Sequence, residues 1–449
     1  MKSRDLSVTS TPNVRHILER SRVALRRISG LVLLRTIRSA AKISCDVAKS
    51  FPIALWPVVN SQEQLADIVA RIEWAVPDMQ PKRPVVVPLH ESLRGIVWDR
   101  MPSTPYLARP KYSNISFQPE YDASRFKSLL QKSSIVLVWD ASSLISGRLL
   151  TSLARLAVID PSFYFLVEYA GWGKLLDCTV APDLVRDLEC ESKINFQALM
   201  ERASRRRVVN VFGRGPSLVD AYRHPLDEQC NIICNGIVRS RTLLKHLRPL
   251  AVTFVDAIHY LGPSRYAARF REDMVRAVID FDMFVVVPDD HVYLLAVHHP
   301  EIRARLIGLK RAQEISVPSP SLPRVMPQDN ILTHIMLPLA LSLKPDVVQI
   351  WGCDGRSPEK SVKFVWERES SVEYEELADT AAAAHPSYFR DFVQEDYYRL
   401  HCSQLAEWMC FAESQGVQVR SCTKSYIQSL RDRSSECFSN DYQPGPRQP

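Results

Sequence analysis

Two periodicities of apolar residues follow each other along most of the chain. Short β-branched runs, typical of strands buried in a parallel sheet, alternate with stretches in which apolar residues recur at the helical spacing of about 3.6. In the C-terminal half these runs predict strands at 208–212, 231–234, 251–255, 283–287 and 347–351, with helices at 217–223, 239–246, 264–279 and 331–343. Strands that alternate with helices predict an α/β domain with a doubly wound, mainly parallel sheet.

The N-terminal half shows a weaker version of this pattern, because prolines interrupt residues 51–130. The remaining periodic stretches predict helices at 61–75 and 144–156 and strands at 84–89, 135–139 and 163–167. A strand, a helix and a second strand in succession form a β-α-β unit. We therefore expect a small α/β region at 51–200 before the main domain.

The main domain is predicted at 205–430. It should close with an aromatic-rich helix at 389–415 and a short strand at 417–419. The segment 356–375 is charged, and we expect it to be mobile, with the acids from 367 to 379 forming a solvated face or a lid. The tail at 431–449 is polar and is expected to be disordered.

The first fifty residues differ from the rest in charge. They hold eleven Lys and Arg against three acids, and apolar residues recur there at helical spacing. A basic amphipathic helix of this kind suits an anionic membrane surface. A helix packed on the protein's own core, or an Arg-rich transit peptide, are the alternatives.

Composition narrows the class of protein. The chain has 449 residues, a net charge of +7 and ten cysteines without a C-x-x-C pair or zinc-type spacing. Structural zinc and a disulfide framework are therefore not expected. No secretory signal pattern and no apolar run of about 18 residues occur. We expect a cytoplasmic protein, held peripherally at the inner membrane face if residues 1–50 bind it.

One turn stands out in the main domain. The predicted strand at 208–212 runs into Gly213-Arg214-Gly215-Pro216-Ser217. Glycines allow a positive φ and close approach of a ligand, and proline suits the first position of a helix. A helix start presents free N–H groups to a phosphate. An ordinary β-α turn fits the same residues, because the full G-x-G-x-x-G pattern is absent.

Three more predicted strands also end in polar residues. Asn235 follows the second strand, Asp256 the third and Asp354 the strand at 347–351. Because the carboxyl ends of parallel strands meet at one edge of the sheet, we expect these side chains to converge on a ligand.

This set of strand ends resembles the bacterial CMP-sialic-acid-dependent sialyltransferases, glycosyltransferase family 42, and their relatives of unassigned or pterin-diphosphokinase function. The G-x-G-P-S-L turn, the Asn that closes the next strand and the unit 331–354 that ends in G-x-D carry the resemblance, over roughly residues 205–425. It implies a Rossmann-like, GT-A-like sialyltransferase fold. It also implies that Gly213, Gly215, Pro216 and Ser217 surround the nucleotide and that Asn235 contacts the CMP moiety.

The resemblance implies a metal-independent, inverting transfer with a histidine as general base. His401 stands at the matching distance before the closing elements, and His385 is the second candidate. The chain departs from the family in several places. Arg214 stands where the family has Asn, Asp256 where it usually has Asn, and 355–366 lacks the tyrosines that hold the leaving phosphate.

The sequence therefore predicts a glycosyltransferase that moves a sugar from a nucleotide-sugar donor, with CMP as one candidate nucleotide, to a glycan or lipid-linked acceptor. No metal or other cofactor is expected. The alternatives are a Mg²⁺-dependent diphosphokinase or phosphotransferase, with Asp256 and Asp354 as metal ligands, and a non-catalytic scaffold. No P-loop, serine-hydrolase, zincin or basic aromatic pattern appears, so nucleic acid is not an expected partner.

Overall fold

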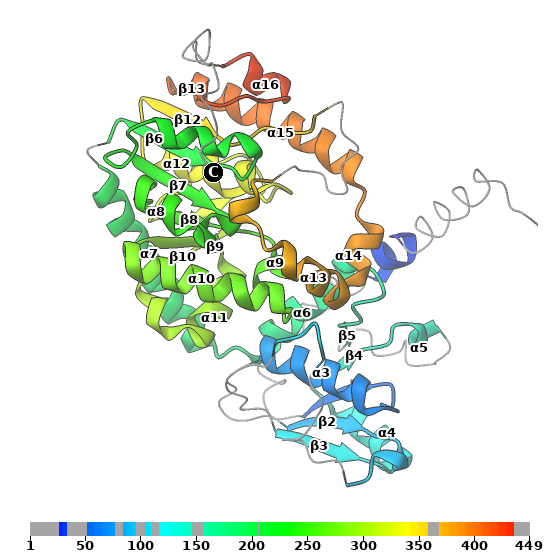
Figure 1. Cartoon of the computed structure of the whole chain (residues 1–449). Helices are drawn as coiled ribbons and strands as arrows, with labels where there is room; N and C mark the ends of the chain where they lie inside the picture. The colour runs from blue at the N-terminus through cyan, green and yellow to red at the C-terminus, as the bar shows by residue number, and fades with distance from the viewer. Residues whose placement is uncertain are drawn as a thin grey trace, which may run out of the picture. The chain divides into compact units, whose positions relative to one another are not determined.

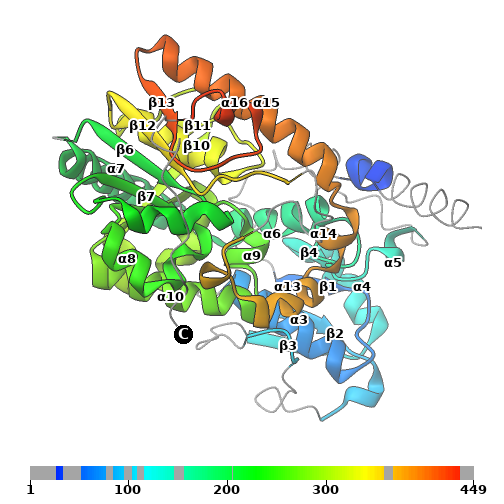
Figure 2. The same cartoon turned by 45° about the horizontal axis from the view of Figure 1, so that its top comes forward.

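We describe the protein from a computed structural model. It covers residues 27–33, 52–76, 84–95, 104–108, 116–145, 156–204, 206–357 and 368–434. The chain divides into two compact units (Figures 1 and 2). The first comprises 1–105, 109–180 and 382–392, and the second comprises 106–108, 181–381 and 393–449.

The first unit is built on a five-stranded parallel sheet of order β3-β2-β1-β4-β5. Its strands are β1 (Ile53–Trp56), β2 (Pro84–Pro88), β3 (Ser116–Glu120), β4 (Ile135–Val138) and β5 (Leu156–Val158). Its helices are α3 (Gln62–Ala75), α4 (Ala123–Lys132), α5 (Ser142–Ile145), α6 (Phe165–Thr179) and α14 (Pro386–Asp391).

Both faces of this sheet are buried, as is usual for parallel sheets. Alternate strand residues such as Ile53 and Leu55 pack in one core cluster, and their neighbours such as Ala54 and Val136 pack in others. Helix α6 approaches β5 very closely at Gly171, where an added Cβ would lie 1.9 Å from the Val158 carbonyl oxygen. Glycine is therefore required at that contact.

The second unit contains an eight-stranded sheet of order β11-β10-β9-β8-β7-β6-β12-β13, with every pair parallel. Its strands are β6 (Val208–Phe212), β7 (Cys230–Cys234), β8 (Ala251–Thr253), β9 (Phe284–Pro288), β10 (Leu306–Arg311), β11 (Arg324–Val325), β12 (Val347–Trp351) and β13 (Gln418–Ser421). Its helices are α7 (Pro182–Ala203), α8 (Arg241–Leu247), α9 (Ala257–Leu261), α10 (Arg265–Phe281), α11 (Asp289–His298), α12 (Leu337–Ser342), α15 (Gln394–Ser414) and α16 (Gln428–Arg431).

The order of these strands reverses between β6 and β12. From β6 the chain adds β7 to β11 in one direction, and β12 and β13 then pair on the other side of β6. Helices α8 and α10 lie side by side along the sheet, and α15 runs beside β13 and α16 (Figures 1 and 2). A ligand crevice is expected at the carboxyl ends of β6 and β12, because the helices after them diverge there.

The predicted fold class is confirmed: the protein is α/β with two parallel sheets. All five strands predicted in the main domain are present within a few residues. The predicted helix at 389–415 is interrupted at Phe392 and Val393, between α14 and α15. Strands β10 and β11 and the long helix α7 were not predicted.

The strand predicted at 163–167 is wrong, because α6 begins at Phe165. The run is apolar enough for a strand, but its buried residues continue at helical spacing through Val167, Gly171 and Leu175. The predicted helix at 144–156 does not reach Leu156, which is the first residue of β5. The prolines around 52–120 also concealed β1, β3 and α4.

The division into units differs from the predicted domains. Helix α7 belongs to the second unit, so the change of unit falls after Val180 and not near 205. Helix α13 (Ala378–Ala384) leads the chain back into the first unit for residues 382–392. Within the described residues, no helix has the length and apolarity to cross a membrane. Most of the predicted helix at 1–50 and most of the tail at 431–449 lie outside those residues.

Candidate functional site

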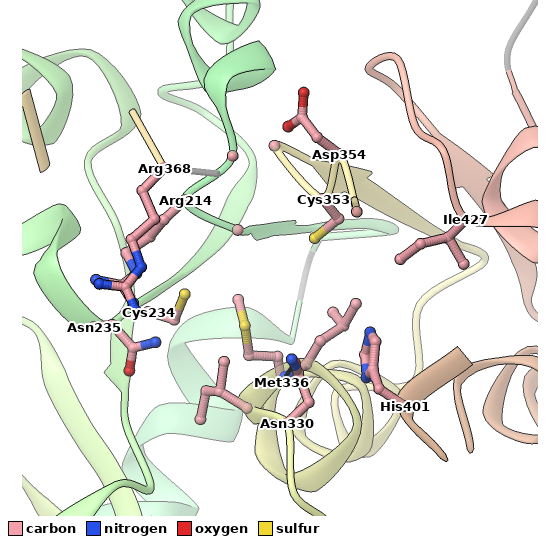
Figure 3. Close-up of a pocket in the computed structure, with 16 residues that line it drawn as sticks. Arg214, Cys234, Asn235, Asn330, Met336, Cys353, Asp354, Arg368, His401 and Ile427 are labelled. Carbon is pink, nitrogen blue, oxygen red and sulfur yellow. Dashed lines mark hydrogen bonds between the residues drawn. The ribbon is translucent and has the colours of Figure 1, made fainter. Parts of the chain in front are cut away.

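A partly open cavity lies at the carboxyl ends of the strands of the second unit. Six of the ten residues predicted for the site line it: Gly213, Arg214, Gly215, Asn235, Asp354 and His401. They come from the ends of β6, β7 and β12 and from α15. The cavity thus occupies the place where the strand order reverses (Figure 3).

Gly213 and Gly215 allow the turn after β6 to pack closely against the turn after β12. A Cβ on Gly213 would lie 2.6 Å from the Gly352 carbonyl oxygen, and one on Gly215 would lie 2.8 Å from the same atom. The backbone N–H of Gly213 donates to Trp351 O and that of Gly215 to Gly352 O. Gly215 has a φ of −66°, so close packing and not a positive φ requires glycine there.

Asp354, which follows β12, also contacts the turn after β6. Its carboxylate accepts hydrogen bonds from the backbone N–H of Ser217 at 3.1 Å and from the Ser217 hydroxyl at 2.8 Å. Burial raises the pKa of Asp354, and the bonds from Ser217 oppose that change. A carboxylate of the chain therefore occupies the position at the start of the 3₁₀ helix Pro216–Arg223 that was predicted for a phosphate.

Asn235 lines the cavity and has one unsatisfied polar atom. It follows β7 with a φ of 51°, a left-handed conformation that Asn tolerates better than most residues. Its side chain is 8% exposed, and its amide oxygen is buried without a hydrogen-bond partner among the described residues. A buried acceptor without a partner is costly, so this oxygen is suited to accept a hydrogen bond from a ligand.

A buried ion cluster forms one wall of the cavity. Glu373 Oε2 accepts from Arg214 Nη1 at 3.2 Å and from Arg368 Nη1 at 2.8 Å. Its other oxygen accepts from the Tyr266 hydroxyl at 2.6 Å. Burial acts to raise the pKa of Glu373, but the charges of Arg214 and Arg368 outweigh it and hold the pKa at about 2. The two guanidinium groups lie side by side in Figure 3.

His401 lies across the cavity from these arginines (Figure 3). It projects from α15 and is 2% exposed. Burial lowers its pKa to about 3, so the imidazole is neutral at pH 7 and can accept a proton. Its basicity is nevertheless low for a general base, which works best with a pKa near the working pH.

The remaining predicted residues do not line the cavity. Pro216 and Ser217 belong to the 3₁₀ helix behind the first turn. Asp256 caps α9, where its Oδ1 accepts from the backbone N–H of His259 at 2.9 Å. Asp256 therefore stands at the carboxyl end of β8, as predicted, but as a helix cap.

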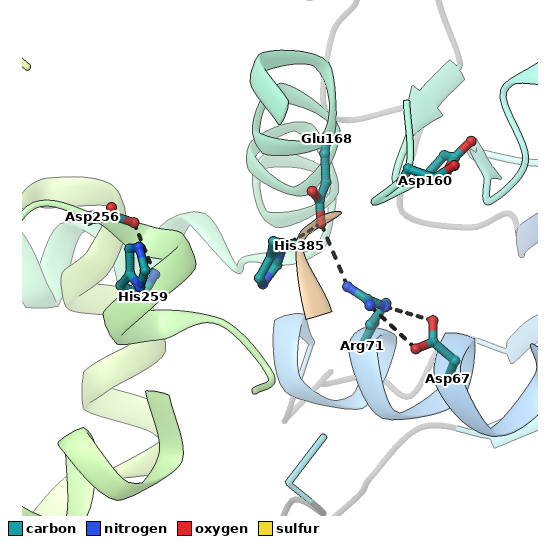
Figure 4. A network of polar contacts seen from close by, with 8 residues as sticks. Asp67, Arg71, Asp160, Glu168, Asp256, His259 and His385 are labelled. Atoms are coloured by element: carbon teal, nitrogen blue, oxygen red, sulfur yellow. Dashed lines mark hydrogen bonds and ion pairs between the residues drawn. The ribbon is translucent and has the colours of Figure 1, made fainter. Parts of the chain in front are cut away.

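His385 belongs to the first unit. Its Nδ1 lies 2.9 Å from Glu168 Oε1, and Arg71 contacts the same oxygen at 3.7 Å (Figure 4). All three side chains are almost fully buried. This arrangement gives His385 a structural partner within its own unit, whereas His401 is the predicted histidine that reaches the cavity.

Arg368 and Glu373 were not predicted as site residues. They fall in the charged stretch that was expected to be a solvated face or a lid, yet Glu373 is 7% exposed. The only hint in the sequence is the placement of Val372 and Tyr374, both fully buried, among the acids. Alternation of charged and apolar residues over so short a stretch is too weak a signal to identify a buried carboxylate.

A tyrosine does reach the segment that follows Asp354. The Tyr398 hydroxyl, on α15, accepts a hydrogen bond from the backbone N–H of Arg356 at 3.2 Å. A Cβ on Gly355 would lie 3.1 Å from that hydroxyl oxygen. Tyr398 therefore contacts the backbone just after Asp354, although it does not line the cavity.

Among the residues that the structure describes, no group of three or more His, Cys, Asp or Glu side chains could hold a metal ion. The acids predicted as alternative Mg²⁺ ligands are separately engaged. Asp354 accepts from Ser217, and Asp256 caps α9.

Comparison with known proteins gives little further guidance. No protein-family model and no curated protein matches the chain. Two solved structures of the sialyltransferase CstII from Campylobacter jejuni show similarity at 10% sequence identity over 53% of this chain. The complex with CMP-3FNeuAc is covered over 93% of its chain with a TM-score of 0.27, and the complex with cytidine 5′-monophosphate over 91% with 0.23. Similarity at this level does not assign an activity.

Proposed function

We propose that the second unit binds a nucleotide-sugar and transfers its sugar to a hydroxyl group of a glycan or lipid-linked acceptor. The observation that carries this proposal is the composition of the cavity. Asn235, whose buried amide oxygen has no partner among the described residues, lines one cavity with two arginines and a neutral histidine where the strand order reverses. Each group matches one requirement of a glycosyl transfer.

The donor would be held by hydrogen bonds and charge. The Asn235 amide oxygen can accept from an amino or hydroxyl group of a nucleoside, because it is buried and has no hydrogen-bond partner among the described residues. Arg214 and Arg368 line the wall beside it and can hold a phosphate oxygen through charge-assisted bonds. Gly213 and Gly215 also line the cavity beside these residues.

The chemistry would be a displacement at the anomeric carbon. The acceptor oxygen forms a bond to that carbon, and the bond from the carbon to the phosphate oxygen breaks, with its electron pair remaining on the phosphate. The acceptor proton passes to a ring nitrogen of His401. The arginines stabilise the negative charge that develops on the departing phosphate.

The low pKa of His401 is compatible with this role once the donor is bound. Burial alone lowers the pKa to about 3. A phosphate that enters the same cavity brings negative charge near the imidazole, and a nearby negative charge raises the pKa of a histidine. The donor would thereby increase the basicity of the residue that must take the proton.

A second part of the proposal concerns the N-terminal helix, of which residues 27–33 are described. Of its described residues, Ile28, Leu31 and Val32 are exposed at spacings of three and four along the helix. We propose that they and the neighbouring arginines meet an anionic membrane surface where a lipid-linked acceptor would lie. Co-sedimentation of the full chain with phosphatidylserine vesicles should decrease in an Ile28→Asp, Leu31→Asp variant. Equal sedimentation would reject this part.

The proposal is tested by calorimetry on the full chain with CMP, CDP, UDP, GDP and ATP, each with and without Mg²⁺. We expect metal-independent binding of at least one nucleotide, weakened about tenfold or more in Asn235→Gly. Glycine tolerates the φ of 51° at this position, so the variant removes the amide and keeps the backbone. The exposed Asn60 supplies the control, as Asn60→Ala should leave the affinity unchanged.

Other outcomes decide between the alternatives. Binding that requires Mg²⁺ would favour a phosphotransferase. No binding of any nucleotide would reject the transferase and favour a scaffold.

A further inference from the structure

The carboxylate of Glu373 fixes two arginines in one place. Both Arg214 Nη1 and Arg368 Nη1 contact the same oxygen, Oε2, and the Tyr266 hydroxyl and the Tyr374 backbone N–H bond to Oε1. With its pKa held at about 2 by the arginine charges, against the effect of burial, Glu373 is ionised throughout the physiological range. The arginines are therefore held close together, despite their like charge, by one shared counter-ion.

The cluster contains two guanidinium groups and one carboxylate, and both arginines line the cavity. Arg214 makes no further side-chain hydrogen bond to a described residue. A guanidinium has five N–H donors in a planar fork, so Arg214 retains donors for a ligand. The nearby imidazole of His259 adds no charge, because burial and the two arginines lower its pKa below the usual value.

Two adjacent guanidinium groups match a ligand with two adjacent anionic groups. The single phosphate of a nucleoside-monophosphate sugar carries one negative charge, and one arginine is sufficient to contact it. The diphosphate of a nucleoside-diphosphate sugar carries two charges on neighbouring phosphorus centres. Bidentate contact between guanidinium and phosphate oxygens then allows each arginine to hold one phosphate.

We propose that the cavity is selective for a nucleoside diphosphate, with Arg214 and Arg368 holding its two phosphates and Asn235 contacting the nucleoside. This inference rests on the proposed function and specifies its donor class. The group that departs in the transfer is then a nucleoside diphosphate, released when the bond between the anomeric carbon and the β-phosphate oxygen breaks. The electron pair stays on that oxygen, and the acceptor proton goes to His401.

The test compares matched pairs of nucleotides on the full chain by calorimetry: UMP with UDP, CMP with CDP and GMP with GDP, without metal. We expect the diphosphate of at least one base to bind ten to a hundred times more tightly than its monophosphate, as is typical of an added charge-assisted contact. Arg368→Gln should reduce this ratio to about threefold or less. Arg368→Lys, which retains the charge, should restore part of it.

Two controls distinguish loss of the proposed phosphate contact from loss of the fold. Arg399→Gln removes an arginine that is 82% exposed on α15, and it should leave both affinities unchanged. The Arg368 variants should keep the monophosphate affinity, which depends on Asn235 and Arg214. If Arg368→Gln loses the monophosphate as well, Arg368→Lys must bind both nucleotides and bind the diphosphate more tightly, or the assignment is wrong.

The outcomes for the two proposals differ. Equal binding of mono- and diphosphate, with both lost in Asn235→Gly, would overturn the diphosphate site and leave the nucleotide-sugar proposal intact. A ratio unaffected by Arg368→Gln would also overturn the role of this arginine. No nucleotide binding at all would overturn the proposed function and, with it, the donor class.

Discussion

Each of the two parallel sheets has one position at which the strand order reverses. The residues at the strand ends differ between these two positions. In both units the strand order reverses once, between β1 and β4 in the first and between β6 and β12 in the second. Each reversal is a place where a crevice can form. In the second unit the strand ends run into Gly213 and Gly352, and a cavity opens there.

In the first unit the equivalent strand ends carry two tryptophans, Trp56 and Trp139. Trp56 ends β1 and stacks on Phe126, with ring centroids 6.4 Å apart. Trp139 follows β4, and its indole N–H donates to the Pro57 carbonyl at 2.8 Å. Its backbone N–H donates to Trp56 O, so the two strand ends are tied together. Topology therefore indicates where a crevice can lie, and the side chains at the strand ends differ between the two units.

Replacement of His401, the proposed general base in the cavity of the second unit, should have the largest effect on activity. His401→Gln keeps a polar side chain of similar size, and we expect kcat for sugar transfer or donor hydrolysis to fall 10² to 10⁴-fold. The pH profile provides a sharper check. Because the pKa is about 3 in the free protein, kcat/KM should be flat from about pH 5 to 8. An acidic limb near pH 6.5 that disappears in His401→Gln would contradict the burial of this imidazole.

Close packing can be tested in the first unit with two glycines of the same helix. Gly171→Ala places a Cβ 1.9 Å from the backbone oxygen of Val158, so something must shift. We expect a loss of about 3 kcal/mol in unfolding free energy of this unit, measured by urea denaturation. Gly173 has no atom within 4 Å of an added Cβ. Gly173→Ala should therefore be neutral or gain roughly 0.5 to 1 kcal/mol; equal losses in the two variants would refute the packing argument.

Low pH should reduce the stabilisation that the buried ion cluster of Glu373, Arg214 and Arg368 provides. The pKa of Glu373 is about 2 in the folded protein and 4.5 as its ordinary value, so the folded state favours the ionised form. The resulting stabilisation, about 3 kcal/mol, is fully present above pH 4.5 and is lost as the pH falls toward 2. Glu373→Gln should thus cost at least this much at pH 7 and much less at pH 3, measured by urea denaturation.

The control for this prediction is an exposed acid. Glu413 pairs with Arg433 and is 42% exposed, so Glu413→Gln should change the unfolding free energy by less than about 1 kcal/mol. A loss in Glu373→Gln that is equal at pH 7 and pH 3 would show that the carboxylate acts through its shape and not through its charge.

A change at the equivalent strand ends of the first unit should have the smallest effect on stability. Trp139→Phe removes the indole N–H that donates to Pro57 and retains most of the ring, so we expect a loss of about 1 kcal/mol. Nucleotide affinity should not change. A change in affinity comparable to that of Asn235→Gly would mean that the first unit takes part in nucleotide binding, and the distinction between the two sets of strand ends would then fail.

Local sequence patterns reliably predicted the features that depend on the backbone, namely the strands of the second unit and the positions of their ends. The β-branched runs of the second unit are buried on both faces, and all five predicted strands form there. The strand ends also indicated Asn235, Asp354 and the glycine turn, because parallel strands deliver their carboxyl ends to one edge. The turn itself was identified correctly, but its physical role differs. Its glycines pack against Gly352 and its helix start receives Asp354.

The wall formed by Arg368 and Glu373 could not be predicted, because the residues are surrounded by acids and nothing local distinguishes a buried carboxylate from a solvated one. The strand and helix at 144–167 were misassigned for a related reason. Short apolar runs fit either structure until their packing partner is known.

The sequence alone determined the α/β class, the parallel arrangement of the main sheet and the edge where a site would lie, since these depend on periodicity and on the direction of strands. Tertiary structure decided which polar side chains meet. Helix α15 brings His401 to the cavity, and residues 368–373 bring the second arginine and its counter-ion. The contact between Arg214 and Glu373 joins residues 159 positions apart. Burial, which affects the pKa of Glu373 and His401, exists only in the folded chain.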